Sequence, residues 1–299
     1  MPDFLNLIAQ QSINGIVLGC LYVMVALGLT LIYGVMNQIN FAHADFVTLG
    51  AFSAYFFVKM VGGSSIGYLA SIPVALAVGA ILGYLVNAAV FAPLRERSDE
   101  LRPLIATIGV SILLENGSLA AFGPIPYQFN SPYADETIRI GKIFFTEQSL
   151  LIVIVAAAAI ASLYAFMKFT FMGKALRAVS QDRETAGLMG INQNQLIMLT
   201  IVIASALAGM SGAMLGPILV LTPFAGAAMI VKSFAIVVIG GFGNMEGTIV
   251  AGLMVGLIEA FTTQYLGAGM IDLVVFALLL LMLLFRPTGL IAERKEENV

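Results

Sequence analysis

Charged and polar side chains interrupt several apolar runs of this 299-residue chain, and their types set the chemistry available to it. If these runs cross a membrane, a charged group at mid-bilayer costs about 2.5–3.5 kcal/mol, so each one needs a partner or a role. Lys232 could pair with either Glu115 or Glu259, or extend its amine to water at an interface. The candidates for a translocation path or a broken helix are Asn37, Asn40, His43, Asp45, Glu115, Asn116, Lys232 and Glu259.

Each of these residues has a structural interpretation beside the functional one. The polar stretch 37–45 predicts either a hydrogen-bonded turn between spans or a broken helix that lines a path. Glu115 and Glu259 are more often hydrogen-bond partners between helices than substrate ligands. None has the neighbours required for acid–base chemistry. The single His43 and single Cys20 exclude a multi-histidine site, a disulfide framework and a cysteine metal site, so we expect no catalytic residue and no metal.

The segment 240–247 holds four glycines in eight residues, Gly240, Gly241, Gly243 and Gly247. Glycine in a helix interior costs roughly 1 kcal/mol relative to alanine, so we expect a non-helical turn here. Such a turn must be covered by protein or face water. Other glycines fall four residues apart, which predicts either close helix packing within the chain or a subunit interface. Examples are the pairs Gly15/Gly19 and Gly252/Gly256.

The stretch 173–192 is long for a connection between helices, which usually takes 2–8 residues. Asp182 can cap a short helix, and Gly190 followed by the hydrophobic Ile191 is a plausible helix stop. Asn192 with Gln195 resembles a capping box that opens the next span. The stretch is either a solvated, capped connector or a short amphipathic helix that docks on a partner. Its apolar residues with helical spacing are Ala175, Ala178, Val179, Ala186 and Met189.

Composition places these features in a membrane protein. Hydrophobic residues make up 60% of the chain and charged residues 10%, with a mean hydropathy of +0.99. A soluble domain carries about 25% charged residues. We expect an all-α, polytopic transmembrane bundle of about eight spans, nine possible, forming a single domain over 1–299. The net charge of −3 is small, and the sequence contains no cluster of basic residues that would form a face for nucleic acid. The expected spans are 11–34, 66–92, 103–122, 149–168, 196–216, 248–265 and 271–286, with short apolar runs at 46–61 and 229–241.

Loop charges predict the orientation, because basic residues concentrate in cytoplasmic loops. The 92–103 loop, the 169–195 loop and the tail are rich in Lys and Arg, whereas the 123–148 loop is acidic and contains prolines. We therefore expect the first three to be cytoplasmic and 123–148 to be external. The N-terminus is external if 46–61 crosses. The basic residues are Arg95, Arg97, Arg102, Lys168, Lys174, Arg177, Arg183, Arg286, Arg294 and Lys295.

Four pieces of the chain, in this order, match a pattern known from one protein family. Each piece alone is weak, but four in order are strong, and the similarity spans nearly the whole chain. The pieces are Tyr33-Gly34-Val35-Met36-Asn37-Gln38-Ile39-Asn40-Phe41-Ala42-His43-Ala44-Asp45-Phe46, the stretch 173–192, the segment 232–247, and Arg286-Pro287-Thr288-Gly289-Leu290.

With these pieces the sequence resembles the permease subunits of ATP-binding cassette importers, and most closely the branched-chain amino-acid type. Two departures are Ala44-Asp45, where the family pattern has Gly-Glu, and Asn244, where it has Ser. The resemblance implies a second permease chain, two cytoplasmic ATPases and an external binding protein. It also implies that 169–195 is the coupling loop that contacts an ATPase, through Gly173, Ala175, Arg177, Asp182, Arg183, Glu184, Ala186 and Gly190.

The sequence lacks the G-x-x-x-x-G-K-[ST] phosphate loop, so we expect no directly bound cofactor, and ATP with magnesium on the partner subunits. The leading hypothesis is a multi-pass, non-enzymatic subunit of the bacterial cytoplasmic membrane that imports branched-chain or other neutral amino acids. We expect a low-affinity polar path, with selectivity in the binding protein. The alternatives are an importer for amides, urea or another small polar solute, a stand-alone secondary carrier, and, least supported, an intramembrane enzyme.

Overall fold

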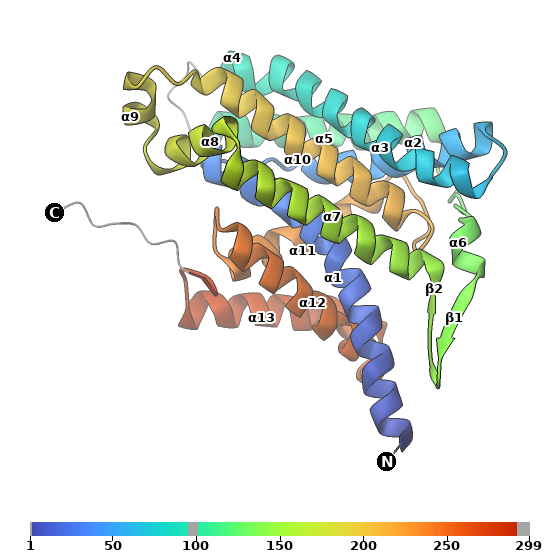
Figure 1. Ribbon diagram of the computed structural model, residues 1–299. Helices are drawn as coiled ribbons and strands as arrows, with labels where there is room; N and C mark the ends of the chain where they lie inside the picture. The colour runs from blue at the N-terminus through green and yellow to red at the C-terminus, as the bar shows by residue number, and fades with distance from the viewer. Residues whose placement is uncertain (1, 95–100, 292–299) are drawn as a thin grey trace.

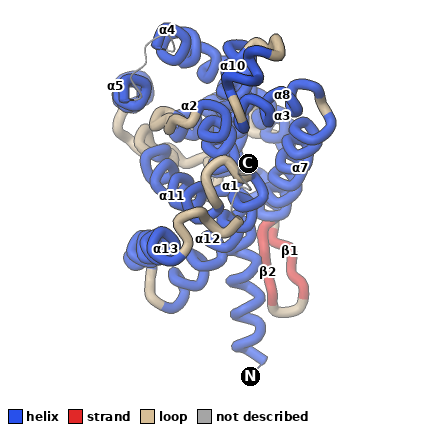
Figure 2. Tube along the Cα trace, turned by 90° about the vertical axis from the view of Figure 1, so that its left-hand side faces the viewer, coloured by secondary structure: helices blue, strands red, loops and turns tan. Residues whose placement is uncertain are grey.

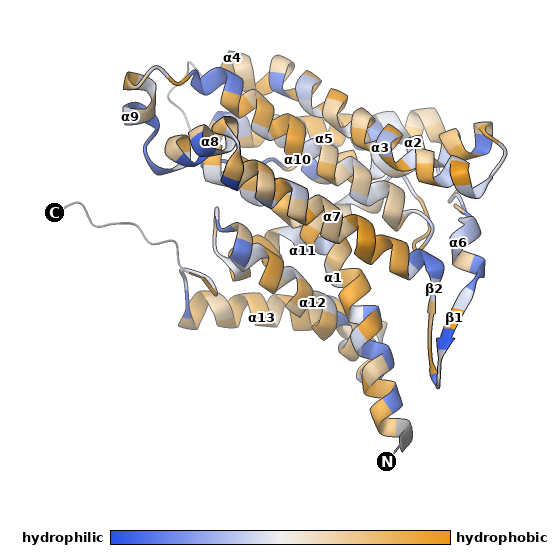
Figure 3. Ribbon diagram, in the orientation of Figure 1, coloured by the Kyte–Doolittle hydropathy of each residue, from blue (hydrophilic) through white to orange (hydrophobic). Residues whose placement is uncertain are grey.

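The computed structural model describes residues 2–94 and 101–291, and Figure 1 traces their path. The predicted cytoplasmic arginines Arg95 and Arg97, and the tail residues Arg294 and Lys295, lie outside the described residues. Helices dominate the described part of the chain, as expected. Figure 3 shows that most residues along these helices are hydrophobic, with the hydrophilic ones mainly toward the two ends of the bundle.

Seven helices of the described ranges are long and apolar enough to cross a membrane, which confirms the predicted polytopic bundle. The third helix continues through a π-helical turn, η1 (Asn87–Phe91), into the short α4 (Ala92–Leu94). The last begins with a 3-10 turn, η2 (Ala268–Met270). The seven are α1 (Pro2–Met36), α3 (Ser65–Val86), α5 (Leu101–Phe122), α7 (Glu147–Phe169), α10 (Gln193–Leu215), α12 (Met245–Tyr265) and α13 (Ile271–Phe285).

The two short apolar runs form the helices α2 (His43–Met60) and α11 (Ala225–Gly240), and both begin inside the protein. The His43 imidazole lies 3.1 Å from the Val25 carbonyl oxygen, which is about three turns, or 16 Å, before the end of α1. The Gly226 amide donates to Thr48 Oγ1 at 2.7 Å, so α11 begins beside the start of α2. Each helix is therefore a partial span, and non-helical chain at 37–42 and 216–224 leads into it.

The bundle has two distinct ends (Figure 1). One, here the α9 end, carries the short helices α8 (Phe171–Gln181) and α9 (Arg183–Leu188). The other, here the hairpin end, carries α6 (Pro132–Asp135) and the antiparallel strands β1 (Thr137–Ile140) and β2 (Ile143–Thr146).

The N-terminal half of α1 lies at the hairpin end. The Gln10 side chain donates to the Phe144 carbonyl at 2.7 Å and accepts from the Phe144 amide at 3.0 Å. The 123–148 connection was expected as a plain loop, and the hairpin within it was missed. Strands of four residues joined at Gly141, which has φ +65°, are too short to give a clear sequence pattern.

Helix α1 lies at the centre of the bundle, and Figure 2 shows other helices around it. Its most apolar window is 89% buried, whereas the corresponding windows of α5 and α13 are 11% and 6% buried. Gly15 and Gly19 of α1 pack directly on the α12 backbone at Gly256 and Leu257. These glycines therefore pack helices of the same chain, as the first interpretation of the four-residue spacing predicted.

We expect Gly256→Ala to destabilise the protein, because a Cβ at this position would collide with the backbone of Gly15 and Gly19. Overpacking of this kind costs typically about 1–3 kcal/mol. Gly117→Ala is the matched control, since a Cβ on Gly117 of α5 meets no atom within 4 Å. Heating followed by size-exclusion chromatography of detergent-solubilised protein should show a lower midpoint for the first variant alone. Equal midpoints would contradict this packing.

Candidate functional site

The segment between α7 and α10 folds as two capped helices, where one amphipathic helix was expected. Thr170 Oγ1 accepts from the Gly173 amide at 3.0 Å and so caps α8. Helix α8 buries Gly173, Ala175 and Leu176 and exposes Arg177. Gly173 lies on the backbone of α7 so closely that a Cβ would overlap Met167. The amphipathic character was predicted correctly, but the helix breaks at Asp182 because its backbone is extended there.

The three predicted caps are confirmed. Asp182 Oδ1 accepts from the Thr185 amide at 3.0 Å, and the other oxygen accepts from the Thr185 hydroxyl. These bonds from the Thr185 hydroxyl and then its amide lower the pKa of the Asp182 carboxyl, so it is ionised at neutral pH. Gly190 has φ +82° and ends α9. Asn192 Oδ1 accepts from the Gln195 amide at 3.2 Å at the start of α10.

Arg183 joins this segment to the centre of the bundle. Its guanidinium donates to the Val35 carbonyl at 2.7 Å, in the last turn of α1. That turn presents carbonyl groups without helical partners, which a cation stabilises. Beyond Ala186, which is buried, α9 and its cap expose Leu188 and Met189 at 87% and 78%. Of the residues predicted to form one apolar face, Ala175, Val179 and Ala186 are therefore buried, whereas Met189 is exposed to solvent.

The glycine-rich segment forms the expected non-helical turn, but the turn contains fewer residues than expected. Gly240 is the last residue of α11 and Gly247 lies in the first turn of α12, so only residues 241–244 are non-helical. Gly241 and Gly243 have φ +106° and +76°, which glycine adopts without strain. Gly240 and Gly247 let the two helix ends meet backbone to backbone.

Asn244 holds this turn to the C-terminal segment. Its Oδ1 accepts from the Gly247 amide at 2.8 Å, which caps α12, and its Nδ2 donates to the Ile291 carbonyl at 3.1 Å. The Leu290 amide also donates to the Ile239 carbonyl at 2.8 Å. Both polar atoms of the side chain at this position, where the residue departs from the family pattern, thus form hydrogen bonds that hold the turn.

The four sequence pieces that carried the resemblance meet at the α9 end. The Tyr33 and Phe242 rings lie 4.3 Å apart between centroids, which places the end of α1 on the glycine turn. Arg183 brings the α8–α9 segment to the same end of α1, and residues 288–291 lie on the turn from the other side. Sequence order alone gave no indication of this meeting.

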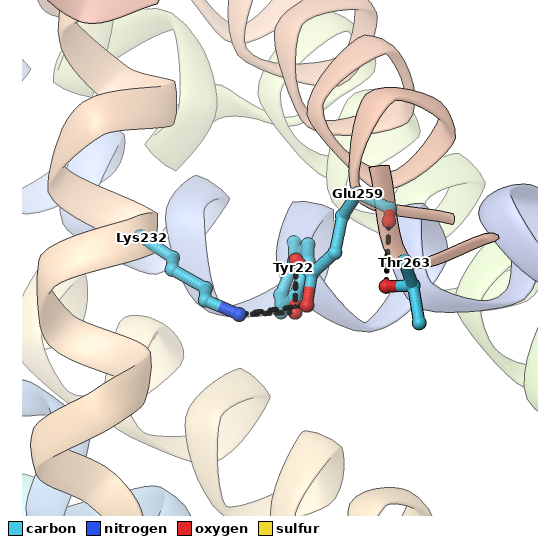
Figure 4. Close-up of polar contacts among 4 residues, drawn as sticks. All are labelled: Tyr22, Lys232, Glu259 and Thr263. Carbon is cyan, nitrogen blue, oxygen red and sulfur yellow. Dashed lines mark hydrogen bonds and ion pairs between the residues drawn. The ribbon is translucent and has the colours of Figure 1, made fainter. Parts of the chain in front are cut away.

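Lys232 pairs with Glu259 rather than with Glu115 (Figure 4). Its Nζ lies 2.8 Å from Glu259 Oε1 and donates to the Tyr22 hydroxyl at 3.1 Å, while that hydroxyl donates to Glu259 Oε2 at 2.7 Å. The triad links α1, α11 and α12, with the two charged side chains 14% and 8% exposed. Tyr22 was missed, because a tyrosine in an apolar run gives no signal of its own. Asn116 is exposed on α5, and among the described residues its side chain bonds only to the Ile112 carbonyl of the same helix.

The polar turn 37–45 combines both interpretations offered for it. Asn37 has φ +54°, and Asn40 Oδ1 accepts from the Ala42 amide at 3.1 Å, as in a hydrogen-bonded turn. It also leads into the partial helix α2. His43 Nε2 faces the Val25 carbonyl, which can only accept, so Nε2 carries the proton and Nδ1 is left as an acceptor. Asp45 lies near Ser111 and Glu115 of α5.

Three buried polar atoms of this turn have no hydrogen-bond partner among the described residues. They are Asn40 Nδ2, His43 Nδ1 and Asp45 Oδ2. An unsatisfied buried group costs about 1–3 kcal/mol, so native proteins seldom keep several together without a use. In the described part of the chain, the protein itself therefore leaves these donors and acceptors free.

Sequence comparison now identifies the family. The profile described as branched-chain amino acid transport system, permease component, matches residues 11–284. This chain belongs to that permease family. It is 33% identical to the high-affinity branched-chain amino acid transport system permease protein LivH of Escherichia coli, over 97% of each chain. It is equally similar to BraD of Pseudomonas aeruginosa, over the full length of both. No solved structure matches this permease significantly.

The family defines the general class of the protein. The permease is a transmembrane transport subunit of the ATP-binding cassette importer type. A more distant relative is the fructose import permease protein FrcC of Rhizobium meliloti, 28% identical over 61% of this chain. Apart from Glu115 and Asn116 of α5, the candidate site residues lie in the segment α8–α9, the glycine turn, the triad and the polar turn 37–45.

We expect Lys232→Met to destabilise the permease by about 3–5 kcal/mol, because it leaves the Glu259 carboxylate buried without its cation. The double variant Lys232→Met, Glu259→Leu should recover most of that loss, since replacing both charges removes the unpaired group. Thermal midpoints of the two variants and the native protein measure the difference. A double variant no more stable than the single one would show that the pair itself is not the source of the loss.

Proposed function

We propose that this permease moves branched-chain or other neutral amino acids inward across the bacterial cytoplasmic membrane, driven by two ATPases that bind magnesium and ATP. The observation that carries the proposal is the α8–α9 segment. Its two helices are capped at Thr170 and Asp182, and Arg183 ties it to the end of the central helix. A connector that only joins two spans would need neither the helix caps nor the hydrogen bond from Arg183 to Val35.

The proposed coupling uses the exposed side of this segment. An ATPase would contact the apolar Leu188 and Met189 together with the charges of Arg177 and Glu184. Movement of α9 would then act on the last turn of α1 through the bond from Arg183 to Val35. The end of α1 continues directly into the polar turn 37–45, so the moving part and the polar atoms are adjacent in the chain.

This proposal assigns the α9 end to the cytoplasm. That end carries Lys168, Lys174, Arg177 and Arg183, and basic residues favour the cytoplasmic side. The C-terminal segment reaches the same end, at Ile291. The hairpin end would then face outward, where an external binding protein delivers the solute, and a second permease chain would complete the passage.

Solute recognition in the membrane would be weak. The unpaired atoms of Asn40, His43 and Asp45 can bond a polar solute in passing. The triad of Tyr22, Lys232 and Glu259 satisfies its own charges, so it does not offer a zwitterion two free partners. Selectivity would therefore lie mainly in the binding protein. The names LivH and BraD favour branched-chain amino acids, while the fructose permease relative keeps other small polar solutes as the second candidate.

We expect charge reversal on the α8–α9 segment, by Arg177→Glu or Glu184→Lys, to weaken co-purification of the proposed partner ATPases several-fold. Both side chains are exposed, so the permease should stay folded. Arg139→Glu on the hairpin is the matched control, and co-purification should be unchanged. Equal recovery of ATPase with all three variants would argue against this segment as the coupling site.

Reconstituted transport provides the second test. The complex in liposomes should take up leucine only with the binding protein outside and ATP inside, and a panel of neutral amino acids, amides and sugars should rank the solutes. Uptake by this chain alone, driven by an ion gradient, would instead establish a secondary carrier.

A further inference from the structure

A cavity of about 370 Å³ opens at the α9 end, between α8 and the transmembrane helices beneath it. Its walls come from the last turns of α1 and α7 and from the C-terminal half of α8. The first turn of α12, with the glycine turn before it, completes them. The volume falls at the lower end of the range of about 300–1,000 Å³ typical of small-ligand sites. The coupling role proposed above shares Arg177 with this cavity but leaves the space itself unassigned.

Opposite charges line different walls of this cavity. Arg177 comes from α8, and Glu246 comes from the first turn of α12. Within the described residues, neither side chain forms an ion pair or hydrogen bond that would occupy it. Lys168 lies at the same site, with its ammonium over the rings of Tyr164 and Phe169. A free cation and a free carboxylate facing one space suit a ligand that carries both charges.

The remaining walls combine apolar residues with the polar side chains of Thr30, Ser180, Gln181 and Asn244. Leu31 and Val35 of α1, Met167 of α7 and Leu176 of α8 all line the cavity. Apolar walls with a few convergent polar groups are the usual composition of a small-molecule site. The two opposite charges fit a zwitterionic head, and the apolar residues beside them fit an aliphatic side chain.

We propose that this cavity binds an aliphatic α-amino acid from the cytoplasmic side, with its ammonium on Glu246 and its carboxylate on Arg177. The inference rests on the proposed function for the identity of that side and of the transported solute. Because α8 forms one wall and the start of α12 another, a bound amino acid bridges the coupling segment and the transmembrane helices. A ligand that favours one arrangement of these elements shifts their equilibrium. Accumulated amino acid would thereby slow further import.

The chain offers a direct reporter for this site, because it contains no tryptophan. Tyr164→Trp places a single indole at the cavity wall. Titration of the purified full-length Tyr164→Trp chain with leucine should give a saturable change in fluorescence in the millimolar range. Adding Glu246→Gln should weaken binding about tenfold or more, since the ammonium loses a charged partner. Adding Glu136→Gln, which removes an exposed carboxylate at the hairpin end, should leave the affinity unchanged.

Two analogues test the assignment of charges. We expect 4-methylpentanoate, which lacks the ammonium, to bind weakly and with no dependence on Glu246. We expect 3-methylbutylamine, which lacks the carboxylate, to bind weakly but to lose further affinity in Glu246→Gln. Analogues that match leucine in affinity would overturn the assignment.

Failure of this inference can be told apart from failure of the proposed function. No fluorescence response to leucine, in a chain whose complex still imports leucine, would overturn the cavity site alone. Loss of ATPase co-purification in Glu246→Gln would also overturn it, because the carboxylate would then serve the partner protein. In the reconstituted complex, millimolar leucine on the ATP side should lower ATP hydrolysis, and Glu246→Gln should reduce that sensitivity.

Discussion

The close approach of α1 to its neighbours is the constraint on which the other features depend. Gly15 and Gly19 bring the α12 backbone against α1, and this contact places Glu259 within reach of Tyr22 and Lys232. Without a buried central helix, α2 and α11 could not begin inside the protein, because lipid would not satisfy the backbone of the chain that leads into them. Packing by glycine is thus what permits polar atoms at depth.

Local features were predictable because they depend on residues close in sequence. The caps at Asp182, Gly190 and Asn192 each involve partners within about one helical turn, so side-chain type and spacing sufficed. The long spans followed from hydropathy for the same reason. The break between α8 and α9, by contrast, was missed, although the cap at Asp182 already required an extended residue there.

Features that join distant residues could not be predicted. The contact between Arg183 and Val35 spans 148 positions, and the bond between Tyr22 and Glu259 spans 237. No single-sequence pattern pairs such residues, since an exposed arginine and a buried tyrosine are ordinary where they stand. The depth at which α2 begins was equally hidden. It is set by the His43 imidazole against the Val25 carbonyl, a contact that hydropathy does not register.

The proposed coupling segment and the proposed binding cavity lie at the same end of the bundle, where they share the last turn of α1. The last turn of α1 accepts the Arg183 bond, lines the cavity at Val35 and leads into the polar turn at Asn37. The glycine turn beside it contains two residues of positive φ, so its backbone follows a path that larger residues would resist. A displacement of α8 would therefore alter the cavity and the approach to α2 at once. The proposed coupling then needs no long relay, because the segment that an ATPase would hold contacts the last turn of α1, which leads directly into the polar turn.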